Sequence, residues 1–163
     1  MALLKWLDKY IEELLLVLLA ATMVTVVFTQ VFMRFVLSYS LPWSEELARY
    51  CFIWIVYIGI SYGVKKQRHI KVEVIYMLVK GRSKYYLGIF SNLIFLSFAV
   101  FLVVGGFDVA KRLLDFGQLS PALGMSMSMV YLATPVGMFL TSIRILQQMF
   151  LQFKLLSGKN DLL

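Results

Sequence analysis

Residues 14–33 read LLLVLLAATMVTVVFTQVFM and contain no charged side chain. A helix needs about 20 apolar residues to cross the roughly 30 Å hydrocarbon core of a bilayer, and this run has that length. Three further apolar runs of comparable length follow it, at residues 47–64, 85–107 and 127–146. The pattern predicts an all-α integral membrane protein with four transmembrane helices, which we number as the first to fourth spans.

The overall composition favours a membrane over an aqueous environment. Hydrophobic residues make up 61% of the 163-residue chain, and the mean hydropathy is +0.81. In a soluble helical bundle, the alternative fold, such a chain would leave large apolar faces in water, whereas a bilayer accepts them when the backbone is paired within helices. No internal repeat, low-complexity tract or linker divides the sequence, so we expect one membrane domain over residues 1–163.

Basic residues are distributed unequally between the two sides of the four spans. Those between the second and third spans are Lys65, Lys66, Arg68, Lys71, Lys80, Arg82 and Lys84, and the two chain ends add Lys5, Lys9, Arg144, Lys154 and Lys159. On the other side, the cations Arg34, Arg49, Lys111 and Arg112 are matched by Glu45, Glu46, Asp108 and Asp115. Because lysine and arginine collect in cytoplasmic loops, the sequence predicts that both termini are cytoplasmic.

The net charge of +7 indicates a lipid partner rather than nucleic acid. Most of the excess lies beside membrane ends, where anionic headgroups attract each cation by about 1 kcal/mol. We therefore expect an anionic or zwitterionic phospholipid as partner. The cations assigned to the inner membrane surface are Lys65, Lys66, Arg68, Lys80, Arg82 and Lys84.

The segment between the second and third spans predicts a short amphipathic helix. Val72, Ile75, Tyr76 and Val79 fall at i, i+3, i+4 and i+7, and so share one helical face. Basic residues flank this face on both sides, which is typical of a helix lying in the headgroup layer. The alternation of apolar residues over 70–74 leaves an extended segment open as the alternative.

The start of the second span carries a cluster of polar and aromatic residues. Pro42 suits the first turn of a helix, where Glu45 and Glu46 are favoured by the exposed backbone amides. Both carboxylates are spaced to reach Arg49, and Trp43 suits the membrane–water interface. A local ion pair at a helix start explains the pattern, and so does a docking surface for another membrane subunit; spacing alone favours the ion pair.

Small and hydroxylated residues mark the candidate helix contacts, because no hydrophobic effect joins apolar helices in lipid. The first span has a threonine stripe, the second a G-x-x-x-G pair, and the fourth a proline that removes a backbone donor and predicts a kink. These helix-packing candidates are Thr22, Thr25, Thr29, Gly59, Gly63, Pro135 and Gly137.

Groups that carry intramembrane chemistry are scarce. His69 stands alone in the basic inner loop and Cys51 has no second cysteine, so we expect no haem, no disulfide, no metal and no catalytic site. Ion-coupled carriers commonly place carboxylates near the midplane, whereas every acidic residue of this chain is expected in a tail or a loop. The sequence thus disfavours an enzyme and a self-sufficient carrier, and favours a scaffold.

Three blocks of the sequence together resemble the small membrane, or Q-type, subunit of tripartite ATP-independent periplasmic (TRAP) transporters. The first block is Arg34-Phe35 with LPWSEELARY at residues 41–50, and the second is RHIKVE at residues 68–73. The third is SPALG at residues 120–124 followed by YLATPVG at residues 131–137. The resemblance covers roughly residues 10–150, with the blocks in the order of the family.

The resemblance implies a non-catalytic subunit of a sodium symporter in the bacterial inner membrane. Its partners would be a large multi-span subunit that carries the substrate and sodium sites, and a periplasmic binding protein that delivers an organic acid such as a sialic acid or a C4-dicarboxylate. The alternative function is an autonomous homo-oligomeric transporter or channel, with the Gly59 and Gly63 face at its seam. Candidates for the partner surface are Arg34, Pro42, Trp43, Glu45, Glu46 and Arg49.

Overall fold

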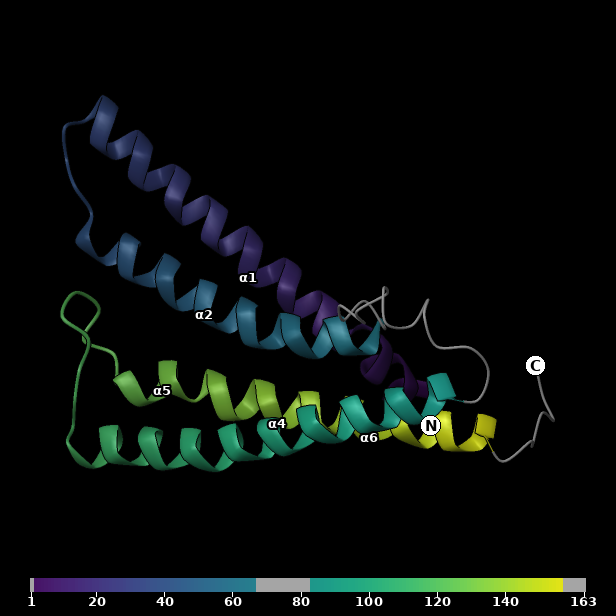
Figure 1. Ribbon diagram of the computed structural model, residues 1–163. Coiled ribbons are helices and arrows are strands. Elements are labelled where there is room, and N and C mark those ends of the chain that lie inside the picture. Colours follow the sequence, from purple (N-terminus) through teal and green to yellow (C-terminus); the bar gives the residue numbers. More distant parts are fainter. Residues whose placement is uncertain (1, 67–82, 157–163) are drawn as a thin grey trace.

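Helices account for the regular structure of the described part of the chain, apart from one β-bridge between Leu119 and Ser126. The computed structural model describes residues 2–66 and 83–156, with side chains over residues 10–66 and 86–152. The helices are α1 (Ala2–Val36), α2 (Pro42–Lys65), α4 (Ser83–Asp115), α5 (Met127–Tyr131) and α6 (Ala133–Leu156) (Figure 1). The predicted all-α membrane fold is confirmed, while the predicted amphipathic helix between the second and third spans lies outside the described residues.

Four stretches of the described residues are long and apolar enough to cross a membrane, and they coincide with the four predicted spans. They are Tyr10–Val36, Pro42–Lys65, Tyr86–Asp115 and Met127–Gln152. The first two begin earlier than the apolar runs that predicted them, so that Glu12 and Glu46 lie within helices. The expectation that every acidic residue lies in a tail or a loop is therefore wrong for these two, and also for Glu13, Glu45, Asp108 and Asp115, which lie within these helical stretches.

The helices form two neighbouring groups. α1 packs on α2, α4 packs on α5 and α6, and α2 packs on α6, so that α2 and α6 connect the groups. Figure 1 shows the groups approaching each other where α2 ends and separating towards the α1–α2 loop. We refer to these as the Lys65 end and the Pro42 end of the bundle.

Glycines permit two close helix contacts at the centre. A Cβ atom on Gly137 of α6 would lie 2.6 Å from the Cβ of Tyr57 and 2.8 Å from its carbonyl oxygen in α2. A Cβ atom on Gly106 of α4 would lie 2.8 Å from the Cδ of Pro135. Close backbone approach of this kind supplies the packing that joins helices in lipid.

The fourth span is interrupted because Pro135 lacks a backbone N–H. α5 ends at Tyr131 and α6 begins at Ala133, so the break falls at Leu132. In a continuous helix the amide of residue 135 would donate to the carbonyl of Tyr131, which a proline cannot do. Leu132 itself keeps helical backbone angles, with φ of −62° and ψ of −19°, so the kink that the sequence expects at this proline stays a prediction.

Replacing Gly137 by alanine is expected to destabilise the protein. The added methyl group would meet the backbone of Tyr57, and overpacking of this kind costs about 1–3 kcal/mol. Thermal unfolding of the full-length chain in detergent should begin several degrees lower than for the parent protein. Gly63→Ala is the matched control, because a Cβ there meets no described atom within 4 Å. Equal unfolding temperatures for the two variants would contradict the close contact.

Candidate functional site

The carboxylate of Glu12 joins three helices at the Lys65 end of the bundle. Glu12 belongs to α1 and is 1% exposed. Its Oε1 accepts hydrogen bonds from the Ser61 hydroxyl of α2 at 2.8 Å and from Nε of Arg144 of α6 at 2.9 Å. The Nζ of Lys65 in α2 lies 3.1 Å from the other carboxylate oxygen, Oε2. One side chain of α1 is therefore bonded to both central helices.

Further polar contacts surround this carboxylate. Arg144 is buried and also donates from Nη1 to Oε1 of Gln147 at 2.9 Å. The side-chain amide of Gln148 donates to the carbonyl of Val64, one of the last carbonyls of α2, which have no donor within the helix. The α2–α6 contact at this end thus satisfies a helix terminus as well as a charge.

The buried charge of Glu12 is compensated by its neighbours at the Lys65 end. Burying an ionised carboxylate costs several kcal/mol unless opposite charges and hydrogen bonds replace the lost water. Arg144 and Lys65 supply those charges, and Ser61 supplies a further donor. The charge pattern of the sequence predicts both cations at cytoplasmic helix ends but puts Glu12 in the tail before the first span, so it does not identify their common partner.

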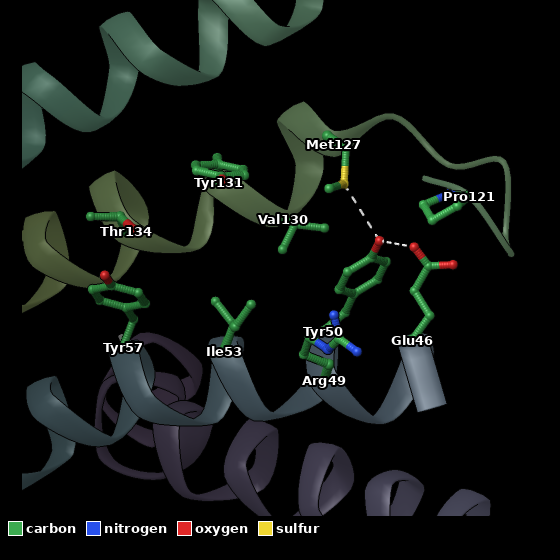
Figure 2. Close-up of a pocket in the computed structure, with 10 residues that line it drawn as sticks. All are labelled: Glu46, Arg49, Tyr50, Ile53, Tyr57, Pro121, Met127, Val130, Tyr131 and Thr134. Atoms are coloured by element: carbon green, nitrogen blue, oxygen red, sulfur yellow. Dashed lines mark hydrogen bonds between the residues drawn. The ribbon is translucent and has the colours of Figure 1, made fainter. Parts of the chain in front are cut away.

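A second buried carboxylate, Glu46, lies in α2 at the Pro42 end. Its Oε1 accepts a hydrogen bond from the hydroxyl of Tyr50, one turn along the helix (Figure 2). Its Oε2 accepts hydrogen bonds from the backbone amides of Ala122 and Leu123, both at 2.9 Å. These amides belong to the loop that precedes α5, so Glu46 ties α2 to the start of the fourth span.

The loop over residues 116–126 has a backbone shape that presents these amides. Gly117 and Gly124 have φ of 61° and 65°, a left-handed conformation that glycine adopts without steric cost. The amide of Ser120 donates to the carbonyl of Met125 at 2.8 Å, and that of Gly124 to the carbonyl of Ser120 at 3.1 Å. The turn leaves two successive N–H groups directed at one carboxylate, a concave arrangement that binds anions.

The spacing along α2 predicts that Glu46 pairs with Arg49. Glu46 instead bonds to Tyr50 and to the loop amides. Glu45 does, through a 3.8 Å contact between its Oε1 and Nη2 of Arg49, and the two side chains are 70% and 65% exposed. An exposed pair of this kind contributes about 0–1 kcal/mol. Helical spacing identifies neighbours along α2, but it carries no information about loop amides that lie 76 and 77 residues further along the chain.

A cavity of about 470 Å³ opens between α2 and the start of the fourth span. Figure 2 shows side chains of α2 directed at those of α5 across this space, and the Tyr50 hydroxyl lies 3.4 Å from Sδ of Met127. We call this cavity the Arg49 groove. Its lining comprises Glu46, Arg49, Tyr50, Ile53 and Tyr57 from α2, and Pro121, Met127, Val130, Tyr131 and Thr134 from the facing wall.

The groove includes two of the six candidates for a partner surface, Glu46 and Arg49. Arg34 is exposed in the last turn of α1, and Pro42 is the first residue of α2. Trp43 follows and is 40% exposed. Of the six candidates, Glu46 is a structural carboxylate that also lines the groove, and Arg49 lines the groove. The other four, which are Arg34, Pro42, Trp43 and Glu45, are exposed at the end of α1 or the start of α2.

The helix-packing candidates differ in their surroundings. Thr22, Thr25 and Thr29 are exposed, and each hydroxyl donates at 2.8 Å to the carbonyl four residues earlier. Gly59 faces α1, where its Cβ would lie 4.0 Å from Cδ2 of Leu16. The threonine face is not covered by the described part of the chain, so its packing role stays a prediction.

The cations assigned to the inner membrane surface also differ in their surroundings. Lys65 is bonded to Glu12 and 18% exposed, so it belongs to the bundle rather than to the lipid surface. Lys66 is exposed, with its ammonium 5.5 Å from the centroid of the Tyr62 ring. Arg68, Lys80, Arg82 and the side chain of Lys84 lie outside the described residues.

The polar contacts among the described residues hold helices and a loop together. No group of three His, Cys, Asp or Glu side chains within residues 2–66 and 83–156 is placed to hold a metal ion. Glu12 and Glu46 are each held by several fixed donors. These two carboxylates and the four apolar helices define a multi-pass membrane protein whose buried charges serve its assembly.

Comparison with known families places the chain within that class. Residues 23–155 match the family described as tripartite ATP-independent periplasmic transporters, DctQ component. The chain belongs to this family, the small permease subunits of TRAP transporters, which confirms the resemblance found in the sequence.

Three relatives illustrate the range of the family. The chain is 29% identical over 150 residues to the isethionate TRAP transporter permease protein DctMQ of Oleidesulfovibrio alaskensis, covering 88% of this chain but 24% of that protein. It is 26% identical to the C4-dicarboxylate TRAP transporter small permease protein DctQ of Vibrio cholerae, covering 93% and 73% of the two chains. It is 28% identical to the sialic acid TRAP transporter small permease protein SiaQ of the same organism, covering 91% and 84%.

Glu12→Ala is expected to destabilise the helix bundle. It removes the carboxylate that faces Arg144 and Lys65, and breaking a buried ion pair in this way costs about 3–5 kcal/mol. The measurement is thermal unfolding of the full-length chain in detergent. Glu13→Ala is the control, because the neighbouring Glu13 is exposed. Should both variants unfold at the parent temperature, Glu12 would not hold the helices together.

Glu46→Gln is expected to loosen the loop over residues 116–126. The side-chain amide keeps an oxygen for the two loop amides and can donate its NH2 group to the Tyr50 hydroxyl, but it carries no charge. Hydrogen bonds to a charged acceptor contribute about 1.5–3 kcal/mol each, against about 0.5–1.5 kcal/mol for neutral ones. Hydrogen exchange at Ala122 and Leu123 should become at least tenfold faster, which corresponds to about 1.4 kcal/mol. Glu45→Gln, one residue away on the exposed face, should leave the exchange unchanged. Equal rates in the two variants would refute the assignment.

Proposed function

We propose that this chain is the small, non-transporting membrane subunit of a sodium-coupled TRAP transporter. It supports a large membrane subunit that carries the substrate and sodium sites, while a periplasmic binding protein delivers an organic acid. The observation that carries this proposal is the bonding of Glu12 and Glu46 to donors of their own chain. A carboxylate that binds and releases a transported ion must be available to that ion, whereas these two hold helices and a loop.

The lengths of the relatives support a division of labour. This chain matches only 24% of the isethionate permease protein, which is therefore several times longer. We infer that the remainder of that polypeptide does the work that a separate large subunit does for this chain.

The cargo is proposed as an organic acid of the sialic acid or C4-dicarboxylate class. Relatives named for isethionate, C4-dicarboxylate and sialic acid transport are all 26–29% identical to this chain. Similar identity to proteins with different named cargo indicates that the small subunit does not select it. We assign that selection to the large subunit and the binding protein.

We further propose that the Lys65 end is cytoplasmic, with both termini on that side of the bacterial inner membrane. Lys65, Lys66 and Arg144 gather at this end, whereas Arg49 at the opposite end is matched by Glu45. Cations are retained on the cytoplasmic side. In a Cys51→Ser background, an impermeant thiol reagent applied to intact cells should label Lys111→Cys and spare Lys66→Cys; the reverse pattern would overturn the orientation alone.

The transport role is tested by reconstituting this chain with and without a large TRAP membrane subunit. Proteoliposomes that contain this chain alone should show no sodium-driven uptake of any candidate acid, because no carrier site is supplied. Adding the large subunit and the loaded binding protein should restore uptake, and a tagged copy of this chain should co-purify with the large subunit in equal amounts. Uptake by this chain alone would instead establish the autonomous transporter or channel.

A further inference from the structure

The Arg49 groove has the length of one membrane leaflet. Along α2 its lining extends from Glu46 to Tyr57, a rise of about 16 Å at 1.5 Å per residue. The hydrocarbon core of a bilayer is about 30 Å thick, so one leaflet supplies about 15 Å. The groove begins near Trp43, an aromatic residue of the type found at the membrane–water interface. It therefore extends from the interface to about the midplane.

The walls of the groove change character along this length. Arg49 and Glu46 lie at the Pro42 end, while Ile53 and Val130 face each other further along (Figure 2). The Glu46 carboxylate takes part in the lining, but its oxygens are held by Tyr50 and two loop amides. The groove thus has one end with an exposed guanidinium, while further along Ile53 and Val130 share the lining with the rings of Tyr57 and Tyr131 and with Thr134.

The volume of the groove fits an acyl chain better than a helix. A dry protein cavity of about 150 Å³ holds one benzene molecule, with six carbons, so 470 Å³ has room for about 18 carbons at the same packing. A helix about 10 Å across and about 16 Å long displaces roughly 1,000 Å³ or more, which is at least about twice the volume of the groove. A whole helix therefore does not fit within the groove, although its side chains could.

The polar end of the groove matches a zwitterionic headgroup. Arg49 presents a planar set of N–H donors that suits a phosphate oxygen pair. Its partner Glu45 touches a single terminal nitrogen at 3.8 Å, and both side chains are mostly exposed. One cation and one anion side by side at the interface complement a headgroup that carries a phosphate and an ammonium.

We propose that the Arg49 groove is a binding site for one zwitterionic phospholipid of the leaflet at the Pro42 end. Its phosphate binds Arg49, its ammonium lies towards Glu45, and one acyl chain lies between Ile53 of α2 and Val130 of α5. The bound lipid fills the space between the two helix groups where they separate. This inference does not depend on the proposed transport role.

The site is tested with the full-length chain in vesicles of phosphatidylethanolamine and phosphatidylglycerol. After extraction in mild detergent, native mass spectrometry should find one phosphatidylethanolamine retained by the parent chain. Arg49→Ala removes the phosphate contact and Ile53→Trp fills the groove while keeping the cation; each should reduce the retained lipid about tenfold, equivalent to about 1.4 kcal/mol. Arg112→Ala is the control, because Arg112 is an exposed cation in the last turn of α4. Equal retention in all variants would overturn the proposal.

A photoreactive lipid tests the position directly. Phosphatidylethanolamine with a diazirine near the end of one acyl chain should label peptides that contain residues 53–57 and 130–134, and Ile53→Trp should abolish this labelling. Labelling spread evenly over exposed apolar residues such as Phe98 and Phe139 would overturn the site. So would the loss of groove labelling when the large subunit is bound, because a partner helix would then be the occupant.

Discussion

The carboxylate of Glu12 connects helices that apolar packing alone would leave weakly joined. Lipid tails are as apolar as leucine side chains, so helices in a bilayer gain little from burying apolar surface against each other. α1 packs on α2, yet its Glu12 also bonds to Arg144 of α6, 132 residues away. At the opposite end of α2, Glu46 performs a related task for the loop before α5. Together with the Gly137–Tyr57 contact, these bonds fix α2 at both ends and near its middle.

The sequence predicts the helices well and their polar connections poorly. A transmembrane span is determined locally, by a run of apolar residues, and all four runs form apolar helices long enough to cross a membrane. The proline break in the fourth span is local too. The partner of Glu46 is not, because backbone amides of a distant loop leave no side-chain signature. A usable signal for Glu12 did exist: Arg144 falls within the predicted fourth span, at residues 127–146, and a cation in such a place needs an opposite charge.

These features suit a subunit that keeps its shape while another protein moves. The buried carboxylates Glu12 and Glu46 are bonded to donors of their own chain, and the two close glycine contacts meet the Tyr57 backbone and the Pro135 ring rather than flexible side chains. The groups α1–α2 and α4–α6 nevertheless separate towards the Pro42 end (Figure 1). The buried ion pairs of Glu12 lie at the Lys65 end, whereas the Pro42 end is held by the hydrogen bonds of Glu46 and contains the Arg49 groove.

The order in which the partners of Glu12 are synthesised has a consequence for biogenesis. Ser61 follows Glu12 by 49 residues, whereas Arg144 follows it by 132. When the first helical hairpin leaves the translocon, Ser61 and Lys65 are already beside the carboxylate, and the acidic side chain can be neutralised before translation ends. Arg144 enters the bilayer with the last helix and meets an acceptor that is already in place, which lowers the cost of inserting a guanidinium near hydrocarbon.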